Sequence, residues 1–505
     1  MSNDSLKTDG MQAWILALVL FSLLAVYLPH VGRGFVTDDF IWMQESVHDG
    51  RIDLPRLFGT TTGFFRPLVG LSFGLQFLLH GTDPRAYGLF NLLLHLLNVI
   101  LVFLLLRGWE RTRPLAAWGA ALFALNLKAA GMAVGWISGR SELLFSFFLL
   151  LAFWICLNTR EEAPAILRAA RYFLCSAFFL AALLSKETAV AAPLFVPLFV
   201  ILNAKNGSPA HSFFKKYSRH LWAALPFVFA LIVYFLLRIQ SDAYTPFTAP
   251  AYYRFSFSPL LLLKNIGEYL VRSAVLDILI LILILGFYLV KRNPGARRST
   301  AADRGVIAAG LLWFLCFLLP CLFLEARSDL YAYFPQLGLH LACLAWLAAH
   351  ARFPGLYVPT SDALPQEQGS FPGLARVLLL FLLCWSAFLG YQAHRRSVPA
   401  QASSLFCRRL AEAAQEIGTG RKLMLIVDSH SGQRTAPSST VGYGLDAMLH
   451  LFVTAKDLRG EFVTLETARG LLARQLREGV ILVWKNGKVQ RFSRWRRKSP
   501  GKTGR

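Results

Sequence analysis

Two adjacent carboxylates, Asp38 and Asp39, stand in a polar segment directly after the first membrane-length apolar run of this 505-residue chain. A carboxylate just outside a bilayer can act as a general base that takes a proton from an acceptor hydroxyl, and its neighbour can orient the acceptor or bind a divalent cation. The structural alternative is a solvated loop, or a cap for a helix that starts at Phe40. The acidic pair alone does not decide between these two interpretations.

Three cations, Arg140, Lys186 and Arg327, stand where apolar runs meet the face that we expect to carry the acidic pair. Arg grips phosphate oxygens through two parallel hydrogen bonds, and Lys adds a point charge. Together they would suit the phosphate of a lipid-linked donor. Taken singly, each can equally be a charge at a span end whose side chain reaches water.

The composition indicates a polytopic membrane protein, because 55% of the residues are hydrophobic, only 16% are charged and the mean hydropathy is +0.48. The net charge of +23 falls largely in short segments between apolar runs and in the last fifteen residues, which favours a membrane surface over nucleic acid as the partner. The seven cysteines lie almost all within apolar runs. We therefore expect neither a disulfide framework nor a cysteine metal site.

A bilayer span needs roughly 20 apolar residues. Runs of this kind predict about eleven transmembrane helices, near 12–29, 87–106, 115–135, 141–157, 172–186, 188–203, 220–239, 274–290, 305–323, 333–350 and 373–392. The first run has no small-residue cleavage site, so we expect a retained anchor with the N-terminus in the cytoplasm. Four consecutive inner loops are then rich in Lys and Arg, as the positive-inside rule requires. This topology puts the acidic pair and the three cations on the outer side.

Two apolar segments carry further detail. The first outer loop, 30–86, contains Arg66 followed by an apolar stretch at 68–79, which is too short to span comfortably and predicts a helix lying along the interface. The second span carries Asn91, His95 and Asn98 on one helical face, which should point into the bundle. For His95, a role in the site and simple hydrogen bonding between helices both remain open.

The C-terminal region reads as a small soluble α/β domain. It shows helical patterns at 403–417 and 465–478, and strand patterns at 423–427, 480–484 and 489–492, with an Asn-Gly turn between the last two strands. We expect a transmembrane domain at 1–392, the α/β domain at 393–493 and a basic disordered tail at 494–505. A solvated tail is favoured over contact with anionic headgroups.

The order of several short motifs resembles the GT-C glycosyltransferases, and most of all the membrane half of the transmembrane-and-tetratricopeptide O-mannosyltransferases and their bacterial relatives. The resemblance covers about residues 12–350 and rests on Asp38-Asp39, Phe65-Arg-Pro67, Tyr87-Gly-Leu-Phe-Asn-Leu-Leu-Leu-His95, Trp136-Ile-Ser-Gly-Arg140, Leu183-Leu-Ser-Lys-Glu187 and Arg327-Ser-Asp-Leu-Tyr331. It implies an all-α membrane fold that transfers a sugar from a polyprenyl-phosphate donor. The chain departs from that family in having no tetratricopeptide array and in having Glu142 where an aspartate often stands, which leaves the acceptor open.

Residue by residue, the resemblance implies that Asp38 or Asp39 is the catalytic base, with Asp38 preferred. It assigns Arg140, Lys186 and Arg327 to the donor phosphate. Further site candidates are Arg66, His95, Glu142, Glu187 and Tyr331. A divalent cation such as Mg²⁺ or Mn²⁺ at the acidic pair is an additional option. A single displacement at the anomeric carbon would invert it, and the cations would stabilise the departing phosphate, so no second carboxylic acid is needed.

Two other classes of function compete with the enzyme. A lipid-linked sugar flippase or transporter would also place polar residues within the membrane, but internal repeats and midplane charges would be expected and none is evident in the sequence. A non-catalytic envelope scaffold would use the C-terminal domain to bind a partner. The short loops favour a bacterial inner membrane, with the active site and the C-terminal domain in the periplasm. The acceptor, whether protein, lipid or glycan, and the identity of the sugar are left open.

Overall fold

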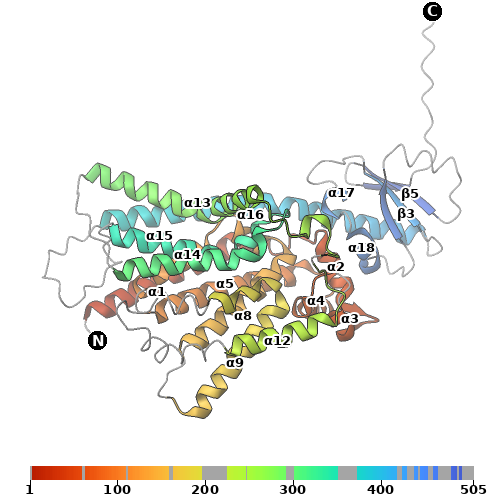
Figure 1. Ribbon diagram of the computed structural model, residues 1–505. Coiled ribbons are helices and arrows are strands. Elements are labelled where there is room, and N and C mark those ends of the chain that lie inside the picture. Colours follow the sequence, from red (N-terminus) through yellow and green to blue (C-terminus); the bar gives the residue numbers. More distant parts are fainter. Residues whose placement is uncertain are drawn as a thin grey trace, which may run out of the picture.

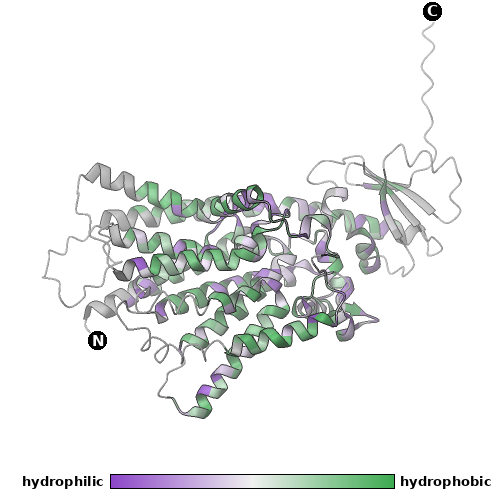
Figure 2. Ribbon diagram, viewed as in Figure 1, coloured by the Kyte–Doolittle hydropathy of each residue, from purple (hydrophilic) through white to green (hydrophobic). Residues whose placement is uncertain are grey.

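The computed structural model describes residues 3–59, 63–109, 112–158, 163–195, 225–245, 247–291, 301–350, 372–417, 423–428, 437–441, 444–452, 459–463, 479–485 and 488–491. Figure 1 shows long helices with similar axes forming a bundle, and a small domain with a sheet at the end of the bundle away from the N-terminus. Figure 2 shows that hydrophobic residues dominate the bundle helices. The predicted helical membrane architecture is therefore confirmed.

Within the described part of the chain, five helices are long and apolar enough to cross a membrane, or six if one bent pair counts as a single span. These five candidate spans are Asp9–His30, Pro84–Gly108, Ile137–Leu157, Ala165–Ser185 and Arg304–Leu322. They belong to α1 (Asn3–Tyr27) with η1 (Leu28–His30), α5 (Pro84–Gly108), η3 (Ile137–Gly139) with α8 (Arg140–Leu157), α9 (Ala165–Ser185) and α14 (Ala301–Leu322). Residues 196–203, the second half of the predicted run at 188–203, lie outside the described residues. The total of about eleven spans stays a prediction.

The predicted span at 115–135 is broken. It forms α6 (Ala116–Ala124) and α7 (Ala129–Gly135), which meet at 58°. Asn126 explains the break, because its side-chain oxygen accepts hydrogen bonds from the backbone nitrogens of Lys128 (2.9 Å) and Ala129 (2.7 Å) and so begins a new helix.

The remaining bundle helices include α12 (Leu225–Ile239), α13 (Pro259–Lys291) and α15 (Gln336–His350). Helices α14 and α15 approach closely at Gly310 and Gly338, because a Cβ atom added at either glycine would overlap the carbonyl oxygen of the other. Short 3-10 turns join the helices at the ends of the bundle: η2 (Arg113–Leu115), η4 (Glu187–Ala191), η5 (Ala251–Tyr253) and η6 (Asp329–Ala332).

The first outer loop is folded. It contains α2 (Asp38–Ser46), a hairpin of β1 (Val47–His48) and β2 (Arg51–Ile52), α3 (Leu54–Gly59) and α4 (Pro67–His80). Helix α4 is the predicted apolar helix, with Pro67 at its first turn, where the missing N–H costs nothing. Its orientation along a membrane interface stays a prediction.

The C-terminal domain combines a four-stranded sheet of order β4-β3-β5-β6 with short helices. Strand β3 pairs in parallel with β4 and β5, and β5 pairs antiparallel with β6 so that Lys485 faces Lys488. The predicted Asn-Gly turn between these two lysines lies outside the described residues. The elements are β3 (Leu423–Asp428), α17 (Pro437–Thr440), α18 (Leu445–Phe452), β4 (Arg459–Val463), β5 (Gly479–Lys485) and β6 (Lys488–Arg491). The predicted helix at 465–478 and the tail 494–505 lie outside the described residues.

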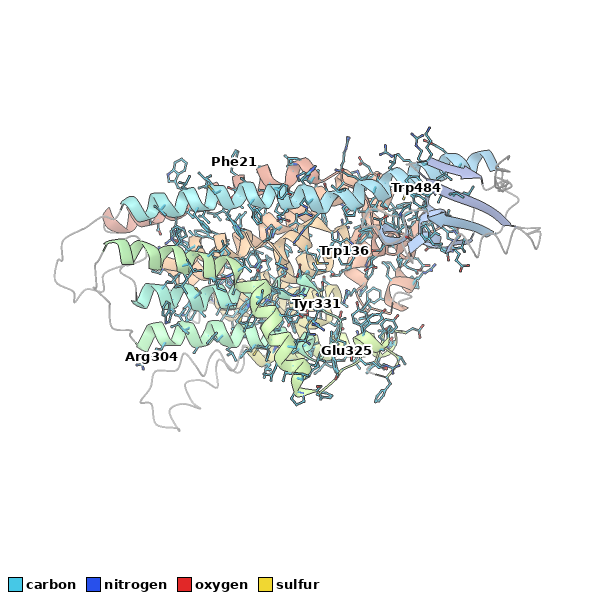
Figure 3. All side chains as sticks on the ribbon, turned by 90° about the horizontal axis from the view of Figure 1, so that it is seen from above. Phe21, Trp136, Arg304, Glu325, Tyr331 and Trp484 are labelled. Carbon is cyan, nitrogen blue, oxygen red and sulfur yellow. The ribbon has the colours of Figure 1, made fainter. Side chains whose placement is uncertain are left out.

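Helix α16 (Pro372–Ile417) runs without interruption from the bundle to this domain and so passes through the boundary expected near residue 392. Its residue Phe406 packs against Trp484 of β5, with ring centroids 5.2 Å apart, and against Phe462 of β4, at 6.1 Å; Trp484 is labelled in Figure 3. The sheet is therefore fixed to the long helix by aromatic contacts.

Candidate active site

Asp39 is fully buried at the start of α2, and both of its carboxylate oxygens accept hydrogen bonds. One oxygen accepts from the backbone nitrogen of Ser138 (2.8 Å) and from the Ser138 hydroxyl, and the other accepts from the backbone nitrogen of Val36 (2.9 Å). Burial raises the pKa of Asp39 to about 7, although the hydrogen bonds from Ser138 and Val36 oppose that rise. Asp39 therefore ties the first outer loop to η3.

Asp38 precedes it on α2 and is only partly buried. Burial raises the pKa of the Asp38 carboxyl to about 6, and the Arg66 guanidinium limits the rise. A carboxyl with this pKa is mostly ionised at neutral pH and is a stronger base than an ordinary aspartate. Both properties suit a general base.

Arg66, at the N-terminus of α4, forms a two-pronged ion pair with Glu187 of η4. Its Nε lies 2.9 Å from Oε2 and its Nη2 lies 2.5 Å from Oε1. Burial alone would raise the pKa of Glu187, but Arg66 outweighs burial and lowers the pKa to about 2. The pair joins the first outer loop to the segment that follows α9.

Lys186 forms a second pair, with Glu142 of α8, and each side chain is only 2% exposed. The Lys186 ammonium also lies 4.8 Å from the ring centre of Tyr331 in η6. Burial raises the pKa of Tyr253 in η5, and the charges of Arg66 and Asp38 both act on its hydroxyl. Arg66 interacts electrostatically with Glu187, Tyr331, Tyr253 and Glu142, so the two ion pairs and the two tyrosines meet near Arg66, whose charge also acts on Asp38.

Arg140 is enclosed in the protein. Its three guanidinium nitrogens point toward the Asn91 side chain (3.1 Å), the Ser72 hydroxyl (3.4 Å) and the Tyr87 carbonyl (3.3 Å). Its guanidinium carbon also lies 4.3 Å from the ring centre of Phe73. This environment suits an arginine that holds α4, α5 and α8 together, so the geometry does not favour the predicted contact with the donor phosphate.

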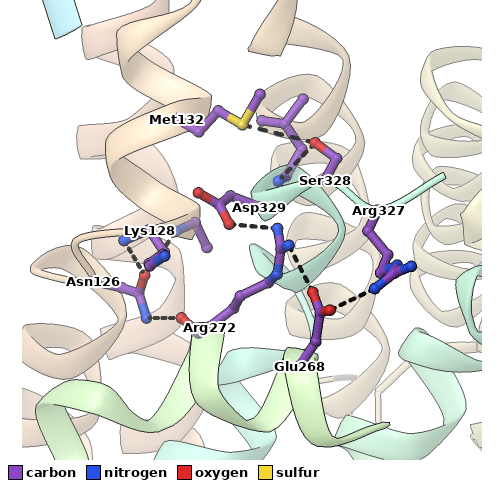
Figure 4. Close-up of polar contacts among 10 residues, drawn as sticks. Asn126, Lys128, Met132, Glu268, Arg272, Arg327, Ser328 and Asp329 are labelled. Atoms are coloured by element: carbon purple, nitrogen blue, oxygen red, sulfur yellow. Dashed lines mark hydrogen bonds and ion pairs between the residues drawn. The ribbon is translucent and has the colours of Figure 1, made fainter. Parts of the chain in front are cut away.

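Arg327 belongs to a separate, partly exposed network, drawn in Figure 4. Its Nη1 lies 2.5 Å from Oε1 of Glu268, while Arg272 pairs with the other oxygen of Glu268 (3.0 Å) and with Asp329 (2.6 Å). Lys128 lies beside this network (Figure 4). Arg327 thus lies near a second cation, Arg272, and its side chain is partly exposed.

His95 is buried inside the bundle, and both ring nitrogens have partners: Nδ1 lies 2.7 Å from the Tyr333 hydroxyl and Nε2 lies 3.2 Å from the Ala124 carbonyl. Asn98 donates to the Leu143 carbonyl (3.0 Å) and to the same hydroxyl. These contacts fit the alternative that the face of Asn91, His95 and Asn98 serves hydrogen bonding between helices.

Three charged residues were missed in the sequence: Arg33, which interacts with Asp39, and Glu268 and Arg272, which belong to the network of Arg327. Arg33 is buried and donates to the Val134 carbonyl, and its charge acts on Asp39, while burial lowers its pKa to about 10. The sequence could have indicated Glu268 and Arg272, because opposite charges four residues apart ahead of an apolar helical run are typical of an ion pair on one helix face.

The acidic pair does not fit a metal ion. No three His, Cys, Asp or Glu side chains converge anywhere in the part of the chain that the structure describes. The oxygens of Asp39 already accept hydrogen bonds from Ser138 and Val36. Mg²⁺ and Mn²⁺ prefer several oxygen ligands, and among the described residues the acidic pair does not supply them.

Comparison with known proteins by sequence identifies a relative of part of the chain. No protein-family model matches the chain. The protein O-mannosyl-transferase Tmtc1 of Drosophila melanogaster is 36% identical over 193 residues, which make up 35% of this chain and 22% of Tmtc1. The chain thus aligns with about a fifth of that relative's length, and it is a distant homologue.

The fold is matched over nearly the full length. The crystal structure of ArnT from Cupriavidus metallidurans bound to undecaprenyl phosphate superposes with a TM-score of 0.51 at 14% identity, covering 94% of this chain and 97% of that one. This chain has the ArnT fold. For the oligosaccharyltransferase AglB of Archaeoglobus fulgidus the TM-score is 0.46 at 11% identity, covering 94% of this chain and 69% of AglB. The assignment of the fold therefore rests on ArnT alone.

The predicted family resemblance is confirmed by these comparisons: the chain resembles the GT-C glycosyltransferases that use polyprenyl-phosphate sugars. The ArnT alignment also extends well beyond the range 12–350 that the sequence motifs cover.

Proposed function

We propose that this protein is an integral membrane glycosyltransferase that moves a sugar from a polyprenyl-phosphate donor to an acceptor hydroxyl, with Asp38 as general base. The observation that carries the proposal is the contrast between the two carboxylates. Asp39 is buried and fully hydrogen bonded, whereas Asp38 is partly exposed and has a pKa of about 6. The ArnT fold supports a polyprenyl-phosphate donor, since ArnT was crystallised with undecaprenyl phosphate.

The reaction is a single displacement. The acceptor hydroxyl attacks the anomeric carbon while Asp38 takes its proton, and the bond to the polyprenyl phosphate breaks, so the anomeric configuration inverts. Phosphate is a good leaving group and needs no acid to protonate it, but the negative charge that it gains requires nearby cations.

Among the cations predicted to hold the donor phosphate, Arg327 has the most suitable surroundings. Its side chain is 25% exposed, and its partner Glu268 is shared with Arg272, so a phosphate can replace Glu268 without leaving a buried charge unpaired. Lys186 is neutralised by Glu142 in a nearly dry pair, and Arg140 is enclosed. We therefore place Arg327 and Arg272 at the phosphate, and Lys186 and Arg140 in support of the fold.

The site would face the outer side of a bacterial inner membrane, with the N-terminus in the cytoplasm. Helices α2, α3 and α4 lie at the end of the bundle that also carries the C-terminal domain, away from the N-terminus (Figure 1). That arrangement supports a common periplasmic location for the active site and the domain. The name of Tmtc1 makes mannose and a protein hydroxyl the first donor sugar and acceptor to test.

The test measures sugar release and transfer from a panel of radiolabelled polyprenyl-phosphate sugars by purified protein in detergent. Wild type is compared with Asp38→Asn, Asp39→Asn and Asp242→Asn, the last removing an exposed carboxylate from the loop between α12 and α13. We expect Asp38→Asn to lose turnover while it still binds donor, and Asp242→Asn to match wild type. Donor binding without turnover by the wild type, with every acceptor offered, would favour a flippase or a scaffold.

A further inference from the structure

The C-terminal domain contacts the loop that carries Asp38. The backbone nitrogen of Thr37 donates a hydrogen bond of 3.0 Å to the carbonyl oxygen of Thr440, at the end of α17. Gly444, just before α18, lies against the same peptide, because a Cβ atom added there would be 2.6 Å from the Thr37 carbonyl oxygen and 3.4 Å from the Phe40 ring. The domain thus touches the residue immediately before the proposed base.

The backbone at Thr37 is strained. Its φ is 38° and its ψ is −103°, a conformation that a β-branched residue rarely adopts. Such a conformation persists only where the surroundings hold it, and strain of this kind is concentrated at functional sites. The hydrogen bond to Thr440 and the close approach of Gly444 supply a restraint at this point.

Two other contacts restrain the same loop from the membrane domain. Gly34 has a φ of 111°, and a Cβ atom added there would overlap the Ala400 carbonyl of α16. Asp39 is held by Ser138. Thr37 lies between these two points, and its restraint comes from the C-terminal domain.

The domain itself is firmly placed. Leu445, Met448 and Leu449 of α18 are buried, and the Asp446 carboxylate accepts a hydrogen bond of 2.7 Å from the Gly460 backbone nitrogen in β4. The sheet is in turn packed on Phe406 of α16. The helix that follows Gly444 is therefore packed within the domain, and the domain is packed on α16.

We propose that the C-terminal domain positions the catalytic base: Thr440 and Gly444, which together we call the clamp, hold Thr37 so that the Asp38 carboxylate points to the reacting hydroxyl. This inference rests on the proposed function of Asp38. The clamp residues are positioning residues, because they act on Asp38 through Thr37.

The test compares Gly444→Ala with Gly460→Ala in the full chain. A methyl group at Gly444 meets the backbone of Thr37, whereas one at Gly460 meets the side chains of Leu449 and Leu445 on the other side of α18. Both variants add a methyl group beside α18, but only the methyl group of Gly444→Ala contacts Thr37 in the loop before Asp38. We expect Gly444→Ala to lower kcat by about 10-fold to 100-fold, the effect of a displacement near 1 Å, with an unchanged KM for the donor.

Two further measurements separate positioning from simple loss of stability. Hydrogen exchange at residues 34–40 should become faster in Gly444→Ala than in Gly460→Ala. The acidic limb of the kcat profile should also move to lower pH, because a displaced Asp38 gains exposure to water. Arg66 before α4, Asp39 of α2 and Tyr253 of η5 interact electrostatically with Asp38, and all three are unchanged in both variants.

Equal kcat and equal exchange in the two variants would overturn the inference, as would faster exchange at residues 34–40 with wild-type kcat and pH profile. If the wild type turns over no donor, the proposed function fails and the inference falls with it. If the wild type is active and Asp38→Asn is inactive while Gly444→Ala behaves like Gly460→Ala, only the role of the clamp is refuted.

Discussion

The backbone nitrogen and the hydroxyl of Ser138 both donate to one carboxylate oxygen of Asp39, across a separation of 99 residues. This arrangement distinguishes two acids that look equivalent in the sequence. Asp39 links α2 to the segment that leads into α8, and its neighbour Asp38 remains partly exposed. The two residues should therefore respond differently to the same substitution.

Asp39→Asn should destabilise the fold by about 1–3 kcal/mol, because an amide has one acceptor oxygen and cannot satisfy both Ser138 and the Val36 nitrogen in a buried site. The unfolding temperature in detergent measures this effect. Ser138→Ala should cost less, since the backbone donor remains. An Asp39→Asn protein as stable as wild type but without turnover would identify Asp39, and not Asp38, as the base.

The buried carboxyl of Asp39 also predicts how stability depends on pH. Its pKa is raised from 3.8 to about 7 in the folded protein, so the folded state binds the proton more tightly than the unfolded state. Its contribution to the free energy of unfolding is fully present below pH 4 and is lost as the pH rises through about 7. The unfolding temperature of the wild type should fall over this window relative to that of Asp39→Asn, and parallel curves would contradict the prediction.

Turnover should have the opposite pH dependence. The base must be ionised, so kcat should rise with pH and reach half of its plateau near pH 6, the pKa of Asp38. Arg66→Gln should move this midpoint upward, because the guanidinium that favours the Asp38 carboxylate is lost and Glu187 is left without its cation. Initial rates at saturating donor between pH 4.5 and 8 measure both effects, with Asp242→Asn as the control. A midpoint that does not respond to Arg66→Gln would argue against Asp38 as the titrating group.

The sequence predicted the helical bundle and the place of the acidic pair because these depend on local patterns. A run of apolar residues reports a span by its length alone. The break at Asn126 was not predicted, since its side chain also donates to the backbone of Arg272 and Ser273 on another helix. Strand β4 was missed because Arg459–Val463 has few apolar residues, and as an edge strand it needs fewer than a central one.

The chemistry of the site was predictable only in part. The positions of Asp38, Arg66, Lys186 and Glu187 were identified from motifs and span ends. Their partners were not, because Arg66 and Glu187 are 121 residues apart and Lys186 and Glu142 are 44 residues apart. Such contacts decide whether a cation can bind a ligand or is already neutralised by a carboxylate. They join residues that are distant in the sequence, so a local sequence pattern does not predict them.

The pair of Lys186 and Glu142 should be sensitive to the loss of either partner. Lys186→Met leaves the Glu142 carboxylate buried without a counter-charge and should cost about 3–5 kcal/mol. The double variant Lys186→Met with Glu142→Leu should recover much of this loss, because both charges are then gone and apolar volume replaces them. Thermal unfolding of the two single variants and the double variant in detergent provides the measurement. Additive losses in the double variant would show that the two side chains do not stabilise each other.

Arg140 and Arg327 should separate support of the fold from donor binding. Arg140→Lys removes the fork that reaches Asn91 and Tyr87, so it should lower the unfolding temperature and leave the donor KM of the folded fraction unchanged. Arg327→Ala should raise the donor KM by about 10-fold, equivalent to about 1.4 kcal/mol, with little change in stability because its ion pair is partly exposed. Arg409→Ala, which removes an exposed ion pair with Glu412 in α16, is the matched control and should change neither quantity. If Arg140→Lys raises the donor KM while Arg327→Ala leaves it at the wild-type value, Arg140 and not Arg327 binds the donor phosphate.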